Sequence, residues 1–214
     1  MTAHEAGDRP AKSRAEVRDI YEENAARFER FGWLEERLVG RYRERLFSRA
    51  EGRVLDVACG TGPNFAHLPE RTDLVGVDLS EAMLRGAART ARDLDRDADL
   101  RVADAEALPF EDDAFDTVVS ALSTCTFPDP VAVLREMDRV CAPDGRILLF
   151  EHGRSSVPAL ARLQDRFASR HFERMGCRWN QEPVDVVREA GLRVEGVRRD
   201  VLGLFTSLVV VPTA

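Results

Sequence analysis

The chain has 214 residues, 44% hydrophobic and 32% charged, which is typical of a single globular domain. Its formal net charge of −7 offers no general attraction to phosphates, so we expect no nucleic-acid partner. The four cysteines include no closely spaced pair, so neither a disulfide framework nor a metal site is predicted.

The first 50 residues divide into a tail and a helical region. Residues 1–13 are polar and contain glycine and proline, which predicts a disordered tail. Helical spacing of apolar residues then predicts two helices, 13–31 and 33–49, so residues 14–50 form an N-terminal unit and 51–214 the main domain. No signal peptide is evident and no apolar run is long enough to cross a bilayer, so we expect a cytoplasmic location.

Short apolar runs alternate with amphipathic segments from residue 53 onward, which predicts a parallel sheet with helices on both faces. The last two runs, 192–199 and 204–211, have a connection so short that they can pair only antiparallel. The predicted fold is α/β, a doubly wound and mostly parallel seven-stranded sheet that ends in an antiparallel hairpin. The other predicted strands are 53–58, 73–78, 100–103, 115–122 and 146–151, and the helices are 64–68, 80–94, 130–141, 157–172 and 183–189.

Small and acidic residues gather where the predicted parallel strands end, which is where open α/β sheets bind ligands. Cys59-Gly60-Thr61-Gly62 follows the first strand, and small residues there let the backbone turn tightly against a ligand. Asp78 ends the second strand, where a carboxylate can bind the two hydroxyls of a ribose, and Asp104 follows the third. The turn matches neither a Walker loop nor GxGxxG. Together these residues predict a cofactor that contains a nucleoside. The position of Asp78 alone does not say which one, since it also fits NAD.

Four segments resemble, in order and spacing, the class I S-adenosylmethionine-dependent methyltransferases, which have a Rossmann-like fold. The resemblance extends over about residues 21–211, and it implies that S-adenosylmethionine is the cofactor. The segments are VLDVACGTG (54–62), GVDLSEAML (76–84), ADAEALPFEDDAFD (103–116) and LREMDRVCAPDGRILLFEH (134–152).

By this resemblance, each strand end holds a different part of the cofactor. The turn from Ala58 to Gly62 lies under it, with Thr61 near the methionine end, and Asp56 either contacts the cofactor or orders the turn. Asp78 binds the ribose. The other implied cofactor residues are Cys59 and Gly60 in the turn, Leu79 and Met83 beside the adenine, Asp104 and Ala105 at its edge, and Ser120 and Ala121 beside the transferred methyl.

Two narrower resemblances concern the methyl acceptor. Tyr21 to Phe28 (Y-x-x-x-A-x-x-F) resembles the lid helix of ubiquinone/menaquinone C-methyltransferases. Segments 119–125, 150–155 and 175–192 resemble the methyltransferase-like thiol S-methyltransferases and, more loosely, bacterial phospholipid N-methyltransferases. The thiol enzymes carry a hydrophobic membrane-anchoring N-terminus that has no counterpart in this sequence, so the acceptor and any peripheral membrane contact stay open.

Arginines also recur every four residues along the predicted helix 157–172. Asp165 and Glu173 interleave with them, which predicts a solvated face stabilised by i, i+4 ion pairs. The alternative is a basic surface that contacts phospholipid headgroups or another anionic substrate. The arginines are Arg162, Arg166, Arg170 and Arg174.

The acceptor side has few candidate residues. His152, after the fifth strand, is either a general base or a histidine that orders its loop, and His171 and Trp179 either line a pocket or pack between helices. We expect in-line methyl transfer to a thiol, quinol or amine of a small molecule or lipid, in which positioning supplies most of the catalysis. The alternatives are a non-catalytic S-adenosylmethionine-binding regulator and an NAD-dependent oxidoreductase. No oligomeric state is predicted.

Overall fold

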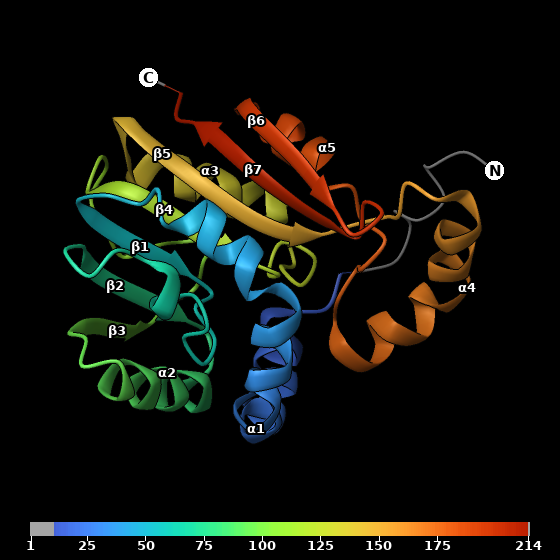
Figure 1. Cartoon of the computed structure of the whole chain (residues 1–214), viewed down its shortest axis with the longest axis horizontal. Coiled ribbons are helices and arrows are strands. Elements are labelled where there is room, and N and C mark those ends of the chain that lie inside the picture. Colours follow the sequence, from blue (N-terminus) through green and yellow to red (C-terminus); the bar gives the residue numbers. More distant parts are fainter. Residues whose placement is uncertain (1–10, 214) are drawn as a thin grey trace.

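A single seven-stranded sheet lies at the centre of the computed structural model, which describes residues 11–213 (Figure 1). Across the sheet the strand order is β3-β2-β1-β4-β5-β7-β6, and β7 runs antiparallel to both of its neighbours while the other pairs are parallel. The predicted fold is therefore confirmed; residues 1–10, most of the predicted disordered tail, lie outside the described residues. The strands are β1 (Arg53–Val57), β2 (Asp73–Asp78), β3 (Ala98–Val102), β4 (Phe115–Ala121), β5 (Cys141–His152), β6 (Arg193–Asp200) and β7 (Phe205–Val211).

The helices pack on both faces of this sheet. Alternate residues of a strand point to opposite faces. Leu55 of β1 therefore packs in the core on the side of α3 and α5, whereas its neighbour Val54 packs in the core on the side of α1 and α2. The helices are α1 (Arg14–Phe47), α2 (Glu81–Asp93), α3 (Pro130–Val140), α4 (Pro158–Met175) and α5 (Pro183–Glu189), and a short 3₁₀ turn (Phe65–His67) stands where the sequence predicts the helix 64–68.

Two strands differ from their predicted bounds by more than one residue. β3 lies two residues earlier at its start, at Ala98. β5 starts at Cys141, well before the predicted residue 146, because Cys141 already pairs with Phe115 of β4. The register then shifts before Thr117 pairs with Arg146. Such an irregular ladder leaves little alternation in the sequence, so the early part of the strand was not recognisable.

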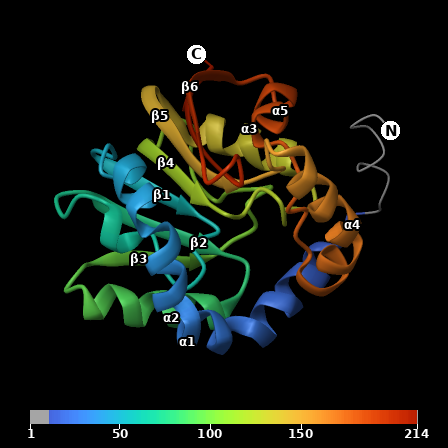
Figure 2. The same ribbon diagram turned by 45° about the vertical axis from the view of Figure 1, so that its right-hand side comes forward.

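α1 is a single helix of 34 residues, so the prediction of two N-terminal helices is wrong. Ser13 and Glu16 form a capping box at its start. Gly32 lies inside the helix, because an isolated glycine costs only about 1 kcal/mol and no proline follows it. The C-terminal half packs on the sheet through buried residues such as Val39 and Phe47, whereas the N-terminal half passes between α2 and α4 (Figure 2).

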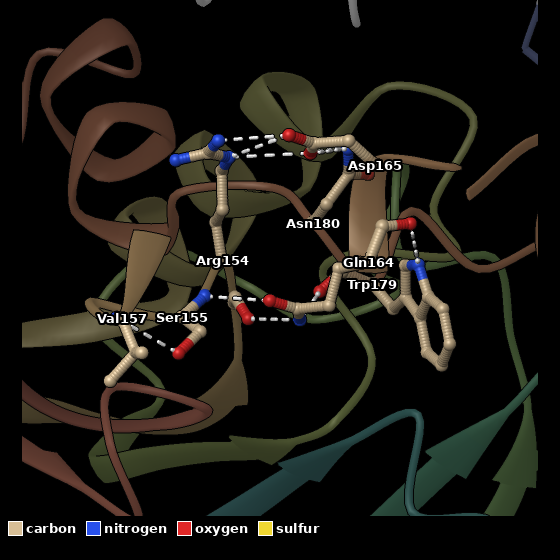
Figure 3. Close-up of polar contacts among 8 residues, drawn as sticks. Arg154, Ser155, Val157, Gln164, Asp165, Trp179 and Asn180 are labelled. Atoms are coloured by element: carbon tan, nitrogen blue, oxygen red, sulfur yellow. Dashed lines mark hydrogen bonds and ion pairs between the residues drawn. The ribbon is translucent and has the colours of Figure 1, made fainter. Parts of the chain in front are cut away.

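The side chain of Gln164 connects α4 to the end of β5 (Figure 3). Its amide nitrogen donates to the carbonyl of Gly153 at 3.0 Å, and its amide oxygen accepts from the backbone N–H of Ser155 at 2.7 Å. The indole N–H of Trp179 donates to the backbone carbonyl of Gln164 at 3.2 Å. Trp179 thus packs on α4, and these bonds set where the helix stands relative to the strand end.

The charged face of α4 does not form the predicted i, i+4 pairs. Asp165 instead pairs with Arg154 at 2.8 Å and accepts a hydrogen bond from Asn180 at 3.0 Å, both outside the helix (Figure 3). Among residues 11–213, no ion pair is formed by the arginines of the charged face of α4, Arg162, Arg166, Arg170 and Arg174.

None of the described helices is long and apolar enough to span a membrane.

Candidate active site

The turn after β1 has a backbone that only small residues tolerate easily. Ala58, Gly60 and Gly62 all have positive φ angles, 56°, 57° and 80°. A β-carbon added at Gly60 would meet no atom within 4 Å, so this residue opens onto free space. A β-carbon at Gly62 would instead lie 2.7 Å from the ring of Phe65. Gly60 therefore lets a ligand approach the backbone, whereas Gly62 serves close packing behind the turn.

Asp78, at the end of β2, ties two strand ends together. One carboxylate oxygen accepts the backbone N–H of Gly60 and the other that of Ser80, both at 2.9 Å. Burial raises the pKa of this carboxyl above its usual value, and the backbone N–H groups oppose the rise. Each oxygen of a carboxylate can accept a further hydrogen bond. Asp78 can thus position the turn and still bind a hydroxyl-bearing ligand.

A cavity of about 330 Å³ opens over these strand ends. This size is within the range of small-molecule sites, roughly 300–1,000 Å³. Most of the residues predicted from the sequence line it, from both the cofactor and the acceptor sides. These are Tyr21, Phe28, Ala58, Cys59, Gly60, Thr61, Asp78, Leu79, Met83, Asp104, Ala105, Ala121, His152 and His171.

Four predicted residues lie behind this lining. Gly62 packs on its own turn, and Trp179 stacks on His171 with ring centroids 4.5 Å apart. The hydroxyl of Ser120 donates to the carbonyl of Val57 at 2.7 Å. The fourth residue is Asp56. All four support lining residues and do not themselves face the cavity.

Asp56 is fully buried beneath the turn. Both of its carboxylate oxygens accept from the side-chain amide of Asn64 at 3.1 Å. Burial raises the pKa of Asp56 to about 7, against the effect of the Asn64 hydrogen bond. Of its two predicted roles, this geometry favours ordering the turn.

Arg43 of α1 is a lining residue that the sequence did not reveal. Its side chain is 1% exposed, and one terminal nitrogen donates to Glu35. Its Nε and other terminal nitrogen have no hydrogen-bond partner among the described residues. Buried donors normally find partners. Nothing in the helical pattern distinguishes this arginine from the many exposed ones, so only the packing shows that it faces the site.

The N-terminal half of α1 covers the side of the cavity near β2 and β3. Arg14 pairs with Asp104 at 2.9 Å and also with Glu106. Glu22 accepts hydrogen bonds from the Ser80 hydroxyl and, at 3.2 Å, from the backbone N–H of Ala82. These contacts are mostly between side chains with exposed surface, which contribute little to stability in water. The N-terminal half of α1, which contains the segment 21–28, is therefore joined to the strand ends and to α2 mainly by these polar contacts.

Two cysteines and a histidine meet on the opposite side of the cavity. The Sγ atoms of Cys125 and Cys177 are 3.1 Å apart, and Nε2 of His152 lies 3.7 Å from the first and 3.6 Å from the second. His152 and Cys177 line the cavity, while Cys125 lies directly behind them. This group was not predicted from the sequence, because residues this far apart in the chain give no local motif.

The protonation of this group is set by burial. Burial raises the pKa of Cys125 well above its usual value. The Cys125 thiol is therefore neutral at neutral pH. Burial lowers the pKa of His152, but the neighbouring Cys125 and Glu151 raise it by more, so the net result is an increase to about 9.

An open α/β sheet with a glycine turn after β1 and a carboxylate ending β2 defines a class of proteins that bind nucleoside cofactors. Within that class, the comparisons point to one family. The family model described as a methyltransferase domain matches residues 55–149.

Three known proteins illustrate the similarity. Methyltransferase OMS1, mitochondrial, from Saccharomyces cerevisiae is 29% identical over 86% of this chain, which spans 44% of that relative's length. A phosphatidylethanolamine N-methyltransferase from Cereibacter sphaeroides is 32% identical over 73% of this chain and 78% of the relative. A solved structure of a SAM-dependent methyltransferase from Thermotoga maritima has a TM-score of 0.72 at 21% identity, covering 92% of this chain and 100% of that one. The chain belongs to the S-adenosylmethionine-dependent methyltransferases, and S-adenosylmethionine is its cofactor.

Proposed function

We propose that this methyltransferase acts on a small molecule or lipid and methylates a thiol, quinol or amine by in-line transfer. The supporting observation is the continuity of the cavity. From the turn at Gly60 it extends to an apolar end lined by Phe28, Phe127 and Met175, beside His152 and Cys177. An acceptor with a largely apolar body fits this end, since apolar lining favours apolar ligands.

The cofactor side has the groups that S-adenosylmethionine needs. The space above Gly60 accommodates a ligand against the backbone, and Asp78 offers free acceptor capacity for the ribose hydroxyls. Leu79 and Met83 line the cavity where an adenine would lie, near Asp104. When bound, S-adenosylmethionine supplies a methyl group on a positively charged sulfur. The remaining predicted contacts are Ala58, Cys59, Thr61 and Ala105, with Asp56, Gly62 and Ser120 supporting them from behind.

Arg43 completes this side in our proposal. Arg43 and Asn64 both line the cavity. Among the described residues, Nε and one terminal nitrogen of Arg43 and the amide oxygen of Asn64 are buried and have no hydrogen-bond partner. A carboxylate and an ammonium group are the complementary partners for such a pair. We therefore assign the carboxylate of the cofactor's methionine end to Arg43 and its amino group to Asn64.

Catalysis on the acceptor side depends mainly on position and exclusion of water. Methyl transfer in line needs the acceptor atom, the methyl carbon and the sulfur aligned, which the protein can provide by orientation alone. Tyr21 and Phe28, stacked at 5.6 Å between ring centroids, would close the cavity from α1. His152 lies at this end with Nε2 facing the sulfurs of Cys125 and Cys177 at 3.7 and 3.6 Å, and positioning alone does not require it to act as a general base. His171 lines the same end, with Trp179 stacked behind it.

The names of the relatives agree with this range of acceptors. One is a phosphatidylethanolamine N-methyltransferase, and others act in ubiquinone and menaquinone biosynthesis. Peripheral membrane contact follows naturally from a lipid acceptor, and the unpaired arginine face of α4 is the surface we would assign to it. A cytoplasmic location stays a prediction, since one relative is named as mitochondrial.

A product assay tests the proposal. Purified protein is incubated with methyl-labelled S-adenosylmethionine and, separately, an apolar thiol, a quinol and phosphatidylethanolamine vesicles. We expect labelled product from one acceptor class and less product from Phe127→Ala, which opens the apolar end. Binding of the cofactor without product from any of the three classes would contradict the proposed acceptor range.

A further inference from the structure

Three ligand atoms that favour soft metals converge beside the acceptor end of the cavity. The Sγ atoms of Cys125 and Cys177 and Nε2 of His152 all lie within 4.8 Å of one another. Within residues 11–213, no other set of three or more histidine, cysteine, aspartate or glutamate side chains lies close enough together to bind one ion. The set is two sulfurs and one imidazole nitrogen, which suits Zn²⁺.

The distances agree with tetrahedral zinc. Zn–S bonds of about 2.3 Å and Zn–N bonds of about 2.0–2.1 Å place sulfur and nitrogen about 3.6 Å apart and two sulfurs about 3.8 Å apart. His152 Nε2 lies 3.7 and 3.6 Å from the two sulfurs, which already matches. Only the two sulfurs, at 3.1 Å, must separate by about 0.7 Å, within the reach of a small side-chain rotation.

The backbone holds the three ligands in place without any ion. Cys125 lies in the connection after β4, His152 ends β5, and Cys177 follows the left-handed C-cap of α4 at Gly176. The backbone N–H of Arg178 donates to the carbonyl of Cys125 at 2.9 Å and so joins two of the three segments. Ligands carried on a prearranged scaffold bind a metal with less ordering cost.

We propose that Cys125, His152 and Cys177 bind one Zn²⁺ whose fourth position faces the acceptor end of the cavity. His152 and Cys177 line that cavity, so a ligand there can reach the ion. Three protein ligands with one open position are the arrangement of catalytic zinc. Binding releases the two thiol protons to solvent and leaves both sulfurs as thiolates.

The open position on the ion also reduces the range of methyl acceptors that fit the site. This inference about the acceptor rests on the proposed function. A thiol that coordinates zinc loses its proton to solvent and is held as a thiolate. Among a thiol, a quinol and an amine, the thiol is the acceptor that this ligand set binds best. We therefore expect thiols to be the preferred acceptors of the metal-loaded protein.

Cobalt substitution tests the site directly. The full chain, reduced and freed of metal with a chelator, is titrated with Co²⁺ and then with Zn²⁺. We expect one Co²⁺ per chain with thiolate-to-cobalt charge-transfer absorption, and its loss as Zn²⁺ displaces cobalt. Adding 2-mercaptoethanol should change the spectrum by occupying the fourth position. No such absorption, or more than one equivalent without it, would overturn the metal site.

Matched variants assign the ligands. Cys125→Ser, Cys177→Ser and His152→Gln should each weaken zinc binding at least tenfold, since even changes behind a ligand cost roughly 10- to 100-fold. Cys141→Ala, which removes a buried thiol elsewhere on β5, should leave it unchanged. Equal zinc affinity in all four variants would overturn the assignment. Titration with S-adenosylhomocysteine on the same variants separates this result from the cofactor site, because Asp78 and Gly60 are intact in each.

Discussion

The two ends of the cavity are built in different ways. The cofactor end consists of backbone turns at strand ends, and its key carboxylate, Asp78, is bonded to backbone N–H groups of the same region. The acceptor end consists of side chains from distant segments, such as Cys125, His152 and Cys177. Within the part of the chain that the structure describes, several buried polar atoms around the cavity have no hydrogen-bond partner, including Nδ1 of His152 and Nε of Arg43. The turn at the cofactor end thus has its hydrogen bonds satisfied within the protein, whereas some side chains around the cavity have donors or acceptors left over for a ligand.

Removing Asp78 should have the largest effect. Asp78→Ala deletes the proposed ribose acceptor and frees the N–H of Gly60, so we expect S-adenosylhomocysteine to bind roughly 100-fold more weakly, measured by calorimetry. Asp73→Ala, at the opposite end of β2 and 72% exposed, is the matched control. A similar loss in both variants would mean that β2 as a whole, and not its carboxyl end, supports binding.

Arg43→Met should come next. If Arg43 binds the methionine carboxylate, the variant should bind S-adenosylhomocysteine roughly tenfold or more weakly, since charge-assisted hydrogen bonds are the strong ones. Thermal stability should stay equal or rise, because a buried cation with unpaired nitrogens is replaced by an apolar side chain. Arg37→Met, exposed on the same helix, controls for changes in α1. Unchanged affinity with lowered stability would give Arg43 a structural role instead.

Removing the ion pairs at the start of α1, the proposed lid, should have a small effect. Arg14→Ala removes the ion pairs with Asp104 and Glu106, which are exposed and screened by salt. We expect cofactor release to become roughly two- to fivefold faster in stopped-flow measurements, with the difference fading at high salt. An equal difference at all salt concentrations would show that the effect is not electrostatic.

The smallest effect on cofactor binding should come from Asp56→Asn. Asp56 lies behind the lining, so affinity should change far less than in Asp78→Ala. The pKa of Asp56 is raised to about 7, so the folded state holds this proton more tightly than the unfolded chain. Its contribution to stability is therefore full at low pH and is lost as pH rises from about 4 to about 7. The asparagine variant should show a flatter melting temperature over that range, and an identical pH profile would contradict the raised pKa.

The same contrast explains what the sequence could reveal. The cofactor end follows from local patterns, because a glycine turn and the carboxylate of Asp78 each stand directly after an apolar strand. Alternating strands and helices likewise predicted the sheet. The acceptor end depends on contacts between residues far apart in the chain, such as Cys125 and Cys177. Arg43 was equally hidden, since burial of one arginine in a long helix leaves no periodic signal.

α1 shows a further limit of local patterns. The boundary between the two predicted helices falls at Gly32, yet the helix continues because its ends are fixed by packing on the sheet and by the capping box at Ser13. Tertiary contacts thus outweighed a weak propensity.

The most direct test is a calorimetric titration of S-adenosylhomocysteine into the wild type and two variants, one from each end of the cavity. We predict one molecule bound per chain in the wild type and in Cys125→Ser, with affinities within about twofold because the sites are independent. Asp78→Ala should bind roughly 100-fold more weakly. No binding to the wild type, or an equal loss of affinity in Cys125→Ser and Asp78→Ala, would contradict the claim that the cofactor end binds its ligand independently of the acceptor end.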